Sequence, residues 1–317
     1  MSKKKKTIII AIPLLLIVLV GLCILSAVGY YQRITDTGLN NTVSYGFGKK
    51  ARVIILAGQS NAAGCSRDDY LQQNVSQEKY KEYENGYDNV YINYFVSESN
   101  ISYGFEKCAA HQGEGYDNNF FGPELGLAEK LNELYPDETF FIIKWAYGGT
   151  TLCDEWRSPS ARRDSGGDLY GSFVQFVKTS LEYLRLRNYD VNIEAVCWMQ
   201  GESDSVEERM TLEYEKNLTA FISDIRSEFS SYASDDGIAF IDAYIAATIF
   251  WKYYNEINAA KQAVADSSPL NVVIDTISHG LTVTEEPADT PDIAHYDSLS
   301  EIKLGHLFAE NLAPFIG

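Results

Sequence analysis

The chain has 317 residues, enough for one large α/β domain or two small ones, and 45% of them are hydrophobic, as in a globular protein with a sizeable core. Acidic residues outnumber basic ones 44 to 26, and the net charge is −18. A surface of this sign repels phosphate backbones, so we expect no nucleic-acid partner.

The N-terminal segment has the pattern of a membrane anchor. Lysines occupy positions 3–6, and the apolar run that follows, over residues 8–28, contains no charged residue. About 20 residues at about 1.5 Å per residue span about 30 Å, the thickness of a bilayer core. Because positive charge stays on the cytoplasmic side, we expect residues 1–7 in the cytoplasm, a transmembrane helix in the lipid bilayer over 8–28, and an extracytoplasmic remainder held at the cell membrane.

A cleaved signal peptide is the alternative for the same segment. The apolar region of a signal peptide usually has about 7–15 residues, fewer than this run. Small residues at Ala27 and Gly29 nevertheless permit cleavage there, and the remainder would then be secreted.

The cysteines give no sign of a metal site. Cys23 lies in the apolar run, and Cys65, Cys108, Cys153 and Cys197 follow it. Export permits disulfides, and four cysteines allow three pairings, among which the sequence does not choose. No CxxC pair or Cys/His cluster has metal-ligand spacing, so we expect neither zinc nor another cofactor.

Beyond a polar spacer over residues 29–50, strand-like and helix-like runs alternate. Continuous apolar strands are predicted at 52–57, 89–96, 139–145, 193–199 and 238–243. Apolar side chains recur at helical spacing over 169–184 and 210–229. This β-α alternation predicts one α/β domain over 51–317, with a parallel sheet covered by helices on both faces.

Three short polar motifs follow predicted strands. GQSN (58–61) follows the first strand, GGT (148–150) the third and QGESD (200–204) the fourth. In open α/β sheets, sites form beyond the carboxyl ends of the strands. One such motif is an ordinary turn, but three of them at strand ends predict a site.

Ser60 follows a glycine at a strand-to-helix turn, where its hydroxyl can project into a cleft. A serine hydroxyl is a weak nucleophile until a nearby base takes its proton. Serine also favours the position that caps a helix, and taken alone Ser60 fits either role equally well.

His295 is the best candidate for that base among four histidines. In the stretch DIAH (292–295), the acid three residues earlier can fold back onto one ring nitrogen and leave the other to face the serine. The stretch SLSE (298–301) has a capping-box pattern, which predicts that a helix begins there and fixes the loop.

An ester hydrolase also needs donors for the oxyanion that develops, and losing one costs about 100–1000-fold in rate. The N–H groups of Ser60 and Gly149 are candidates, because glycine allows close backbone approach, and the Gln200 amide is a third. The alternative interpretation is an ordinary turn at Gly148 and Gly149 and a capped strand end at Gln200.

Together these residues resemble the SGNH-hydrolase superfamily, and within it the sialate O-acetylesterase-like branch, also called carbohydrate esterase family six. The resemblance extends over nearly the whole expected domain, in the family's order. The stretches that carry it are GQSNAAG (58–64), FGPELGLA (121–128), WAYGGTTL (145–152), WMQGESD (198–204) and HYDSLSEIKLGHLFA (295–309).

The resemblance implies a three-layer α/β/α, flavodoxin-like fold around a parallel sheet of about five strands. It also implies that acetyl esters on carbohydrates are hydrolysed through an acyl-enzyme and without a metal. Carried onto this sequence, Ser60 is the nucleophile and His295 the base, and the oxyanion hole consists of Ser60 N–H, Gly149 N–H and Gln200.

Two carboxylates compete for the third place of the triad. Asp292 fits the D-x-x-H spacing and is favoured, whereas Glu202 of the QGESD stretch is the alternative partner of the histidine. Around these residues, we expect Gln59, Asn61 and Thr150 on the substrate side of the site.

The leading hypothesis is therefore a serine esterase that removes O-acetyl groups from an extracellular glycan, of the sialate O-acetylesterase or acetyl xylan esterase type. A lipid or thioester hydrolase of the same superfamily and an inactive glycan-binding module are the alternatives. The polar, tyrosine-rich stretch over 80–119 favours sugars, because aromatic faces stack on pyranose rings. Neither the sugar that carries the acetyl group nor the oligomeric state follows from the sequence.

Overall fold

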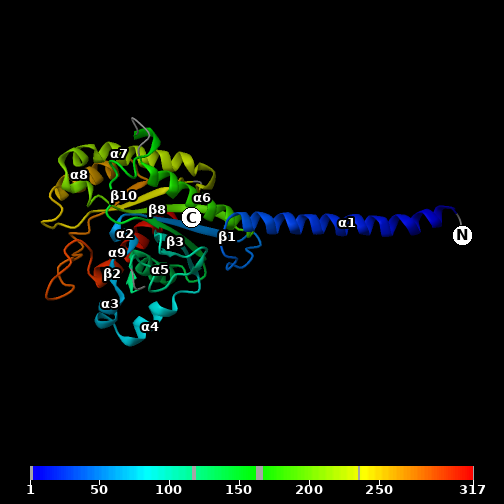
Figure 1. The fold of residues 1–317 in the computed structure, drawn as a ribbon, viewed down its shortest axis with the longest axis horizontal. Coiled ribbons are helices and arrows are strands. Elements are labelled where there is room, and N and C mark those ends of the chain that lie inside the picture. Colours follow the sequence, from blue (N-terminus) through cyan, green and yellow to red (C-terminus); the bar gives the residue numbers. More distant parts are fainter. Residues whose placement is uncertain (1–2, 116–118, 162–166, 235, 317) are drawn as a thin grey trace.

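A mostly parallel β-sheet forms the centre of the fold in the computed structural model, which describes residues 3–115, 119–161, 167–234 and 236–316 (Figure 1). The strands lie in the order β10-β9-β8-β1-β7-β3-β4, and β5 pairs with β3. Six strands are parallel: β1 (Lys50–Gly58), β3 (Val90–Ser97), β7 (Phe140–Ala146), β8 (Asp190–Met199), β9 (Ala239–Ala243) and β10 (Asn271–Ile274). The two-residue strands β4 (Asn100–Ile101) and β5 (Glu106–Lys107) are antiparallel to β3, and β2 (Ser66–Arg67) pairs separately with β6 (Phe120–Phe121).

All five predicted strands are confirmed, and a sixth, β10, extends the sheet by one strand. The central strands β1 and β7 are buried almost along their whole length, which explains their continuous apolar sequence. Strand β10 has only four residues, three of them half-buried, at the edge of the sheet. A run this short has no apolar signature that distinguishes it from a loop.

Helices cover both faces of the sheet, as predicted (Figure 1). On one face lie α6 (Asp168–Leu186), α7 (Glu208–Glu228) and α8 (Tyr254–Asp266), and on the other α5 (Pro123–Leu134) and α9 (Ser298–Leu312). The shorter helices are α2 (Ser60–Ala63), α3 (Asp68–Asn74) and α4 (Gln77–Asn85), with 3-10 turns at Pro159–Ala161, Asp204–Val206, Ser230–Tyr232 and Ala313–Phe315. The chain thus has three layers, α/β/α. All five cysteines are free thiols.

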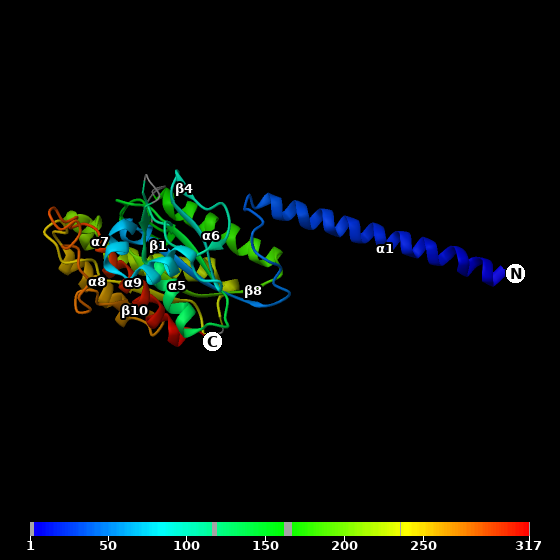
Figure 2. The same ribbon diagram turned by 90° about the horizontal axis from the view of Figure 1, so that it is seen from below.

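Helix α1 (Lys3–Asp36) extends away from one end of the domain (Figures 1 and 2). Its part Leu15–Asp36 has a mean hydropathy of 2.1 and is long and apolar enough to cross a membrane. An uncleaved anchor and a signal sequence share this composition. The helix continues past residue 28, where the apolar run ends, and its last turns pack on the domain, so that Ile34 is only 4% exposed.

The segment 37–49, part of the predicted spacer, lies against the domain. Val43 is buried, its N–H donates to Tyr183 Oη (3.3 Å), and its carbonyl accepts a hydrogen bond from Arg187. The Asn40 N–H donates to the Tyr103 carbonyl (2.6 Å). These contacts hold the segment after α1 against the domain, at the end of the sheet where the parallel strands begin.

Helices α5 and α9 touch through two glycines. A Cβ atom on Gly126 would lie 2.0 Å from the Ile302 carbonyl oxygen, and one on Gly305 would lie 2.2 Å from the Pro123 carbonyl oxygen. Both distances are impossible for real atoms, so the two backbones can approach this closely only without side chains. This contact fixes α9, whose first residues follow the loop that carries His295.

We predict that Gly305→Ala lowers the free energy of unfolding by about 1–3 kcal/mol, because the added methyl group forces α5 and α9 apart. Urea unfolding of the detergent-solubilised full chain measures this change. Gly171→Ala in α6 is the matched control, since no atom lies within 4 Å of its added Cβ. The control should be neutral or stabilise by up to about 1 kcal/mol, and equal effects of the two substitutions would contradict the packing argument.

Candidate active site

The three polar motifs that follow predicted strands lie side by side. Strand β1 pairs with β7 on one side and with β8 on the other, and Gly58 at its end is in register with both Ala146 and Met199. A Cβ atom on Gly58, whose φ is 144°, would lie 1.9 Å from the Met199 carbonyl oxygen. The chain can therefore leave β1 at this point only with a glycine.

Ser60 is the first residue of helix α2, and Gln59 occupies the capping position before it. The alternative role of Ser60 as the helix cap therefore does not apply. The side chain is largely buried (9% exposed), and its hydroxyl forms no hydrogen bond with another described residue. Its N–H is among the first of a helix, which have no intrahelical acceptor. Both groups are thus available to a bound molecule.

His295 is bonded to an acid within its own turn. Its Nδ1 lies 2.7 Å from Asp292 Oδ2, and the Ala294 N–H donates to the other oxygen of that carboxylate (3.1 Å). Burial by itself would lower the pKa of His295, but the hydrogen bond and charge of Asp292, with a contribution from the adjacent Cys65, raise it above its ordinary value. The same hydrogen bond lowers the pKa of Asp292. Of the two carboxylates predicted for this place, Asp292 is the one at the ring nitrogen.

The three predicted oxyanion donors differ in their surroundings. Gly149 has a φ of 72°, and no atom lies within 4 Å of the position that its Cβ would take. Its N–H, like that of Ser60, donates to no described acceptor. Gln200 is fully buried, and its Nε2 donates to Asp204 (2.7 Å) and to the Thr150 carbonyl (3.0 Å). The Gln200 donors are therefore engaged within the protein.

Two adjoining cavities lie near the site, and His295 lines one of them. The first, of about 290 Å³, is lined by His295, Asp292 and Tyr70 among others. The second, of about 400 Å³, is lined by a polar set that includes Ser97, Ser99, Glu98, Glu114 and Tyr147. Cys65 and Phe120 line both cavities, so they form the boundary between them.

Residues 50–314 match the profile of a protein family described as carbohydrate esterase, sialic acid-specific acetylesterase. The chain belongs to this family. It is therefore a carboxylic ester hydrolase of the carbohydrate esterase class, and its three-layer α/β/α fold is the one that the sequence resemblance implied. A comparison with curated proteins found no match.

Solved structures share the fold of this esterase. NanS has a TM-score of 0.61 at 16% identity, over 86% of this chain and 99% of NanS. A protein from Arabidopsis thaliana has a TM-score of 0.60 at 19% identity, over 83% of this chain and 98% of the other. A carbohydrate acetylesterase from Xanthomonas citri has a TM-score of 0.54 at 12% identity, over 81% of this chain and 55% of the other.

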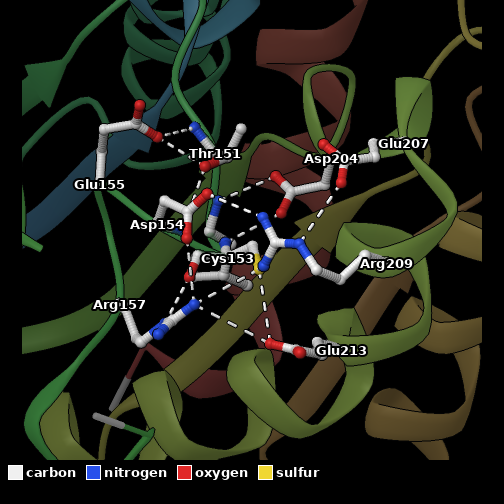
Figure 3. A network of polar contacts seen from close by, with 10 residues as sticks. Thr151, Cys153, Asp154, Glu155, Arg157, Asp204, Glu207, Arg209 and Glu213 are labelled. Atoms are coloured by element: carbon white, nitrogen blue, oxygen red, sulfur yellow. Dashed lines mark hydrogen bonds and ion pairs between the residues drawn. The ribbon is translucent and has the colours of Figure 1, made fainter. Parts of the chain in front are cut away.

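In this esterase, Asp204 holds the loop that carries Gly149 (Figure 3). Its carboxylate accepts hydrogen bonds from the backbone N–H groups of Leu152 (2.8 Å) and Cys153 (2.9 Å), as well as from Gln200. Around it, Arg209 is paired with Asp154 (3.2 Å). No role is predicted for Asp204 from the sequence, where its only signal is its place at the end of the QGESD stretch.

The three residues expected on the substrate side are buried within the protein. Gln59 is 1% exposed, and its Oε1 accepts hydrogen bonds from Gln200 Nε2 (3.2 Å) and the Ser203 N–H (3.2 Å). Thr150 is 7% exposed and donates to the Tyr147 carbonyl (2.7 Å). Asn61 is 1% exposed. Gln59 and Asn61 bond to distant parts of the chain and Thr150 to its own loop, so all three side chains belong to the framework of the site.

The predicted capping box at residues 298–301 is not formed. Asp297 precedes the helix, and its carboxylate accepts hydrogen bonds from N–H groups of residues 284–286. Ser298 Oγ donates to Glu286 (2.7 Å). Glu301 points inward instead, because the buried face of α9 includes its position. The loop before α9 is therefore closed by Asp297.

Glu301 belongs to a group of buried carboxylates behind the site. Its side chain is fully buried, and neither oxygen has a hydrogen-bond partner among the described residues. Burial, together with the charges of Glu124 and Glu202, raises its pKa well above the ordinary value. Lys144, the buried cation nearby, is engaged with Glu124 at 2.6 Å. Glu301 is therefore held in its neutral form.

We predict that Glu301→Gln stabilises the protein increasingly as the pH rises. The raised pKa means that the folded state binds a proton that the unfolded state releases above about pH 4.3, so the wild type loses stability with rising pH. Glutamine has no such proton. Urea unfolding from pH 5 to pH 9 should reveal a difference between variant and wild type that grows by about 1 kcal/mol or more.

The matched control is Glu310→Gln, since Glu310 is exposed on the same helix. Its effect should vary little over this pH range. A stability difference for Glu301→Gln that is independent of pH would mean that Glu301 does not retain a proton in the folded protein.

Proposed function

We propose that this esterase removes O-acetyl groups from a glycan outside the cell, and that Ser60 is its nucleophile. The observation that supports this best is the Asp292–His295 pair, whose Oδ2 and Nδ1 atoms are 2.7 Å apart and which lines a cavity open to solvent. A histidine held by a carboxylate is the base that a serine hydroxyl needs. The family of the chain supplies the ester as the bond that is broken.

In the proposed reaction, the Ser60 hydroxyl attacks the acetyl carbonyl carbon while His295 Nε2 takes the proton. The oxyanion accepts hydrogen bonds from the N–H groups of Ser60 and Gly149. The intermediate then collapses, and the sugar hydroxyl leaves with the proton from His295. Water, deprotonated by His295, attacks the acetyl-enzyme and releases acetate. Asp292 stabilises the imidazolium in both halves of the reaction.

The cavities support a sugar substrate over a lipid. A long acyl chain needs a continuous apolar channel, whereas the polar side chains of Ser97, Glu98 and Glu114 interrupt the lining of the second cavity. The rings of Phe120 and Tyr147 offer faces on which a pyranose can stack. We infer that the acyl group is small and that the larger part of the substrate is a carbohydrate.

The position of α1 supports a substrate away from the bilayer. We infer that α1 is a signal anchor and that the catalytic domain is extracytoplasmic. Strand β1 begins at the edge of the sheet near α1, and its nine residues at about 3.3 Å each carry the chain about 30 Å to Gly58. In Figure 1, α2 lies on the far side of the sheet from α1. A site in this orientation faces soluble or cell-wall glycans, and membrane lipids lie behind it.

We predict that Ser60→Ala abolishes acetate release from acetylated xylan and from p-nitrophenyl acetate, because no nucleophile remains to form the acyl-enzyme. Ser172→Ala, at an exposed position of α6, is the matched control and should retain turnover. Circular dichroism and thermal unfolding establish that both variants are folded. Turnover at the wild-type rate by folded Ser60→Ala would refute the assignment of the nucleophile.

We further predict a sharp preference for short acyl groups. The kcat/KM for p-nitrophenyl esters should fall at least about tenfold from acetate to octanoate, because the polar cavity leaves apolar carbons without contacts. Parallel assays on acetylated xylan, O-acetylated sialic acid and a phospholipid in mixed micelles rank the natural substrate classes. Faster turnover of octanoate and phospholipid than of the sugar esters would favour the lipid hydrolase.

A further inference from the structure

The side chain of Asn61 connects the nucleophile segment to the loop of the histidine. Asn61 Nδ2 donates to the Ala294 carbonyl (3.3 Å), and its Oδ1 accepts a hydrogen bond from the Tyr296 N–H (3.1 Å). These two peptide groups lie immediately before and after His295. One amide thus holds the backbone on both sides of the base, across more than 230 positions of sequence.

Glu202 fixes the orientation of this amide. Its Oε1 accepts a short hydrogen bond from Asn61 Nδ2 (2.7 Å), and both side chains are buried, at 1% and 0% exposure. The flipped amide is excluded because it would place Oδ1 against the Ala294 carbonyl and Nδ2 against the Tyr296 N–H, and Glu202 Oε1 adds a third contact that favours nitrogen at this position. In the orientation that remains, the nitrogen faces Ala294 and the oxygen faces Tyr296.

A second contact from the same segment supports this connection. Ser66 Oγ donates to the Tyr296 carbonyl (2.6 Å). Residues 60–66 therefore bond to both the N–H and the C=O of the residue after His295. The loop between β10 and α9 has no regular secondary structure between residues 275 and 297. Its position at His295 consequently depends on such side-chain contacts.

We infer that Asn61 is a positioning residue that sets His295 against Ser60, and that Glu202 holds the Asn61 amide in the orientation this requires. The inference rests on the proposed roles of Ser60 and His295. Because Ser60 and Asn61 are consecutive in α2, a shift of the loop relative to Asn61 is also a shift of the base relative to the nucleophile. Proton transfer needs these two groups within about 2.6–3.2 Å of each other.

Asn61→Ala tests this role. We expect kcat for p-nitrophenyl acetate to fall about 10–100-fold, because a misplacement of about 1 Å can cost about 100-fold in rate. KM should stay within about twofold, since the buried Asn61 side chain has no access to substrate. The matched control is Asn89→Ala, which removes an asparagine that donates to two backbone carbonyls, those of Tyr135 and Glu138, at the opposite edge of the sheet. The control should lower the melting temperature and leave kcat within about twofold.

The pH profile separates positioning from a change in the base itself. His295 accepts a proton only when neutral, so kcat/KM rises with pH through its pKa. The groups whose charges reach His295 are Asp292, Cys65, Glu114, Glu202 and Glu301. Asn61→Ala removes a hydrogen bond only from Glu202, which is not among the main causes of the raised His295 pKa, and the Asp292–His295 bond lies within one turn and moves with it. In Asn61→Ala, the maximum value of kcat/KM at high pH should therefore fall. The pH range over which kcat/KM rises, its acidic limb, should stay where it is in the wild type.

Asp292→Asn provides the contrast. It removes the carboxylate that raises the pKa of His295, so its acidic limb should move to lower pH. An acidic limb that moves in Asn61→Ala as it does in Asp292→Asn would overturn the positioning role. So would a kcat within twofold of the wild type, or a large rise of KM at unchanged kcat, which would indicate a direct contact with substrate.

Two Glu202 variants keep the inference testable if Asn61→Ala does not fold. Glu202→Leu removes the acceptor of Asn61 and should lower kcat to a similar extent, whereas Glu202→Gln offers an oxygen and should recover most of it. Equal kcat values for the two would refute the inference. Ser60→Ala is assayed in parallel. If it retains activity, the proposed function fails; if it is inactive while Asn61→Ala turns over normally, only the positioning role fails.

Discussion

The parallel pairing of β1 between β7 and β8 is the constraint on which the site depends. Parallel strands end at the same edge of a sheet, so the turns after three neighbouring strands must meet there. The first turn supplies Ser60, the second Gly149, and the third the carboxylates Glu202 and Asp204. None of these turns forms a site alone. Hydrogen bonds join the turns to one another: Asn61 of the first turn donates to Glu202 of the third, and Asp204 of the third accepts from N–H groups of the loop that follows the second.

The position of His295 at this end of the sheet has a different structural cause. It lies on an irregular loop at the far end of the chain, and no strand pairing determines its place. Helix α9 anchors one end of the loop, and its close contact with α5 requires the glycines at positions 126 and 305. Asp297, Asn61 and Ser66 hold the rest through hydrogen bonds to backbone groups. Packing thus brings the loop near the sheet, and buried hydrogen bonds define its position there.

Buried carboxyl groups are concentrated behind the contact between Asn61 and the loop that carries His295. Glu202, Glu301 and Glu124 are all fully buried, and Lys144 pairs with the last of them. Removing charges from water is costly, and the raised pKa of Glu301 is the result. Glu202 is also buried, and one of its oxygens bonds to Asn61 while the other has no partner among the described residues. A wholly apolar layer here would remove the shorter of the two hydrogen bonds that Asn61 Nδ2 donates, and leave the longer one to the Ala294 carbonyl.

The sequence by itself determined the five long strands, the amphipathic helices and the short motifs at the strand ends, because continuous apolar runs and helical periodicity are local properties. It also determined the D-x-x-H turn, whose two side chains are three residues apart. Only the tertiary structure decided that Gln59 and Asn61 point into the framework, and that Glu301 turns inward where a capping box was predicted. The direction of a polar side chain depends on which partner covers it. For Asn61 that partner is contributed by residues 202 and 294–296, whose proximity exists only once the sheet and α9 have formed.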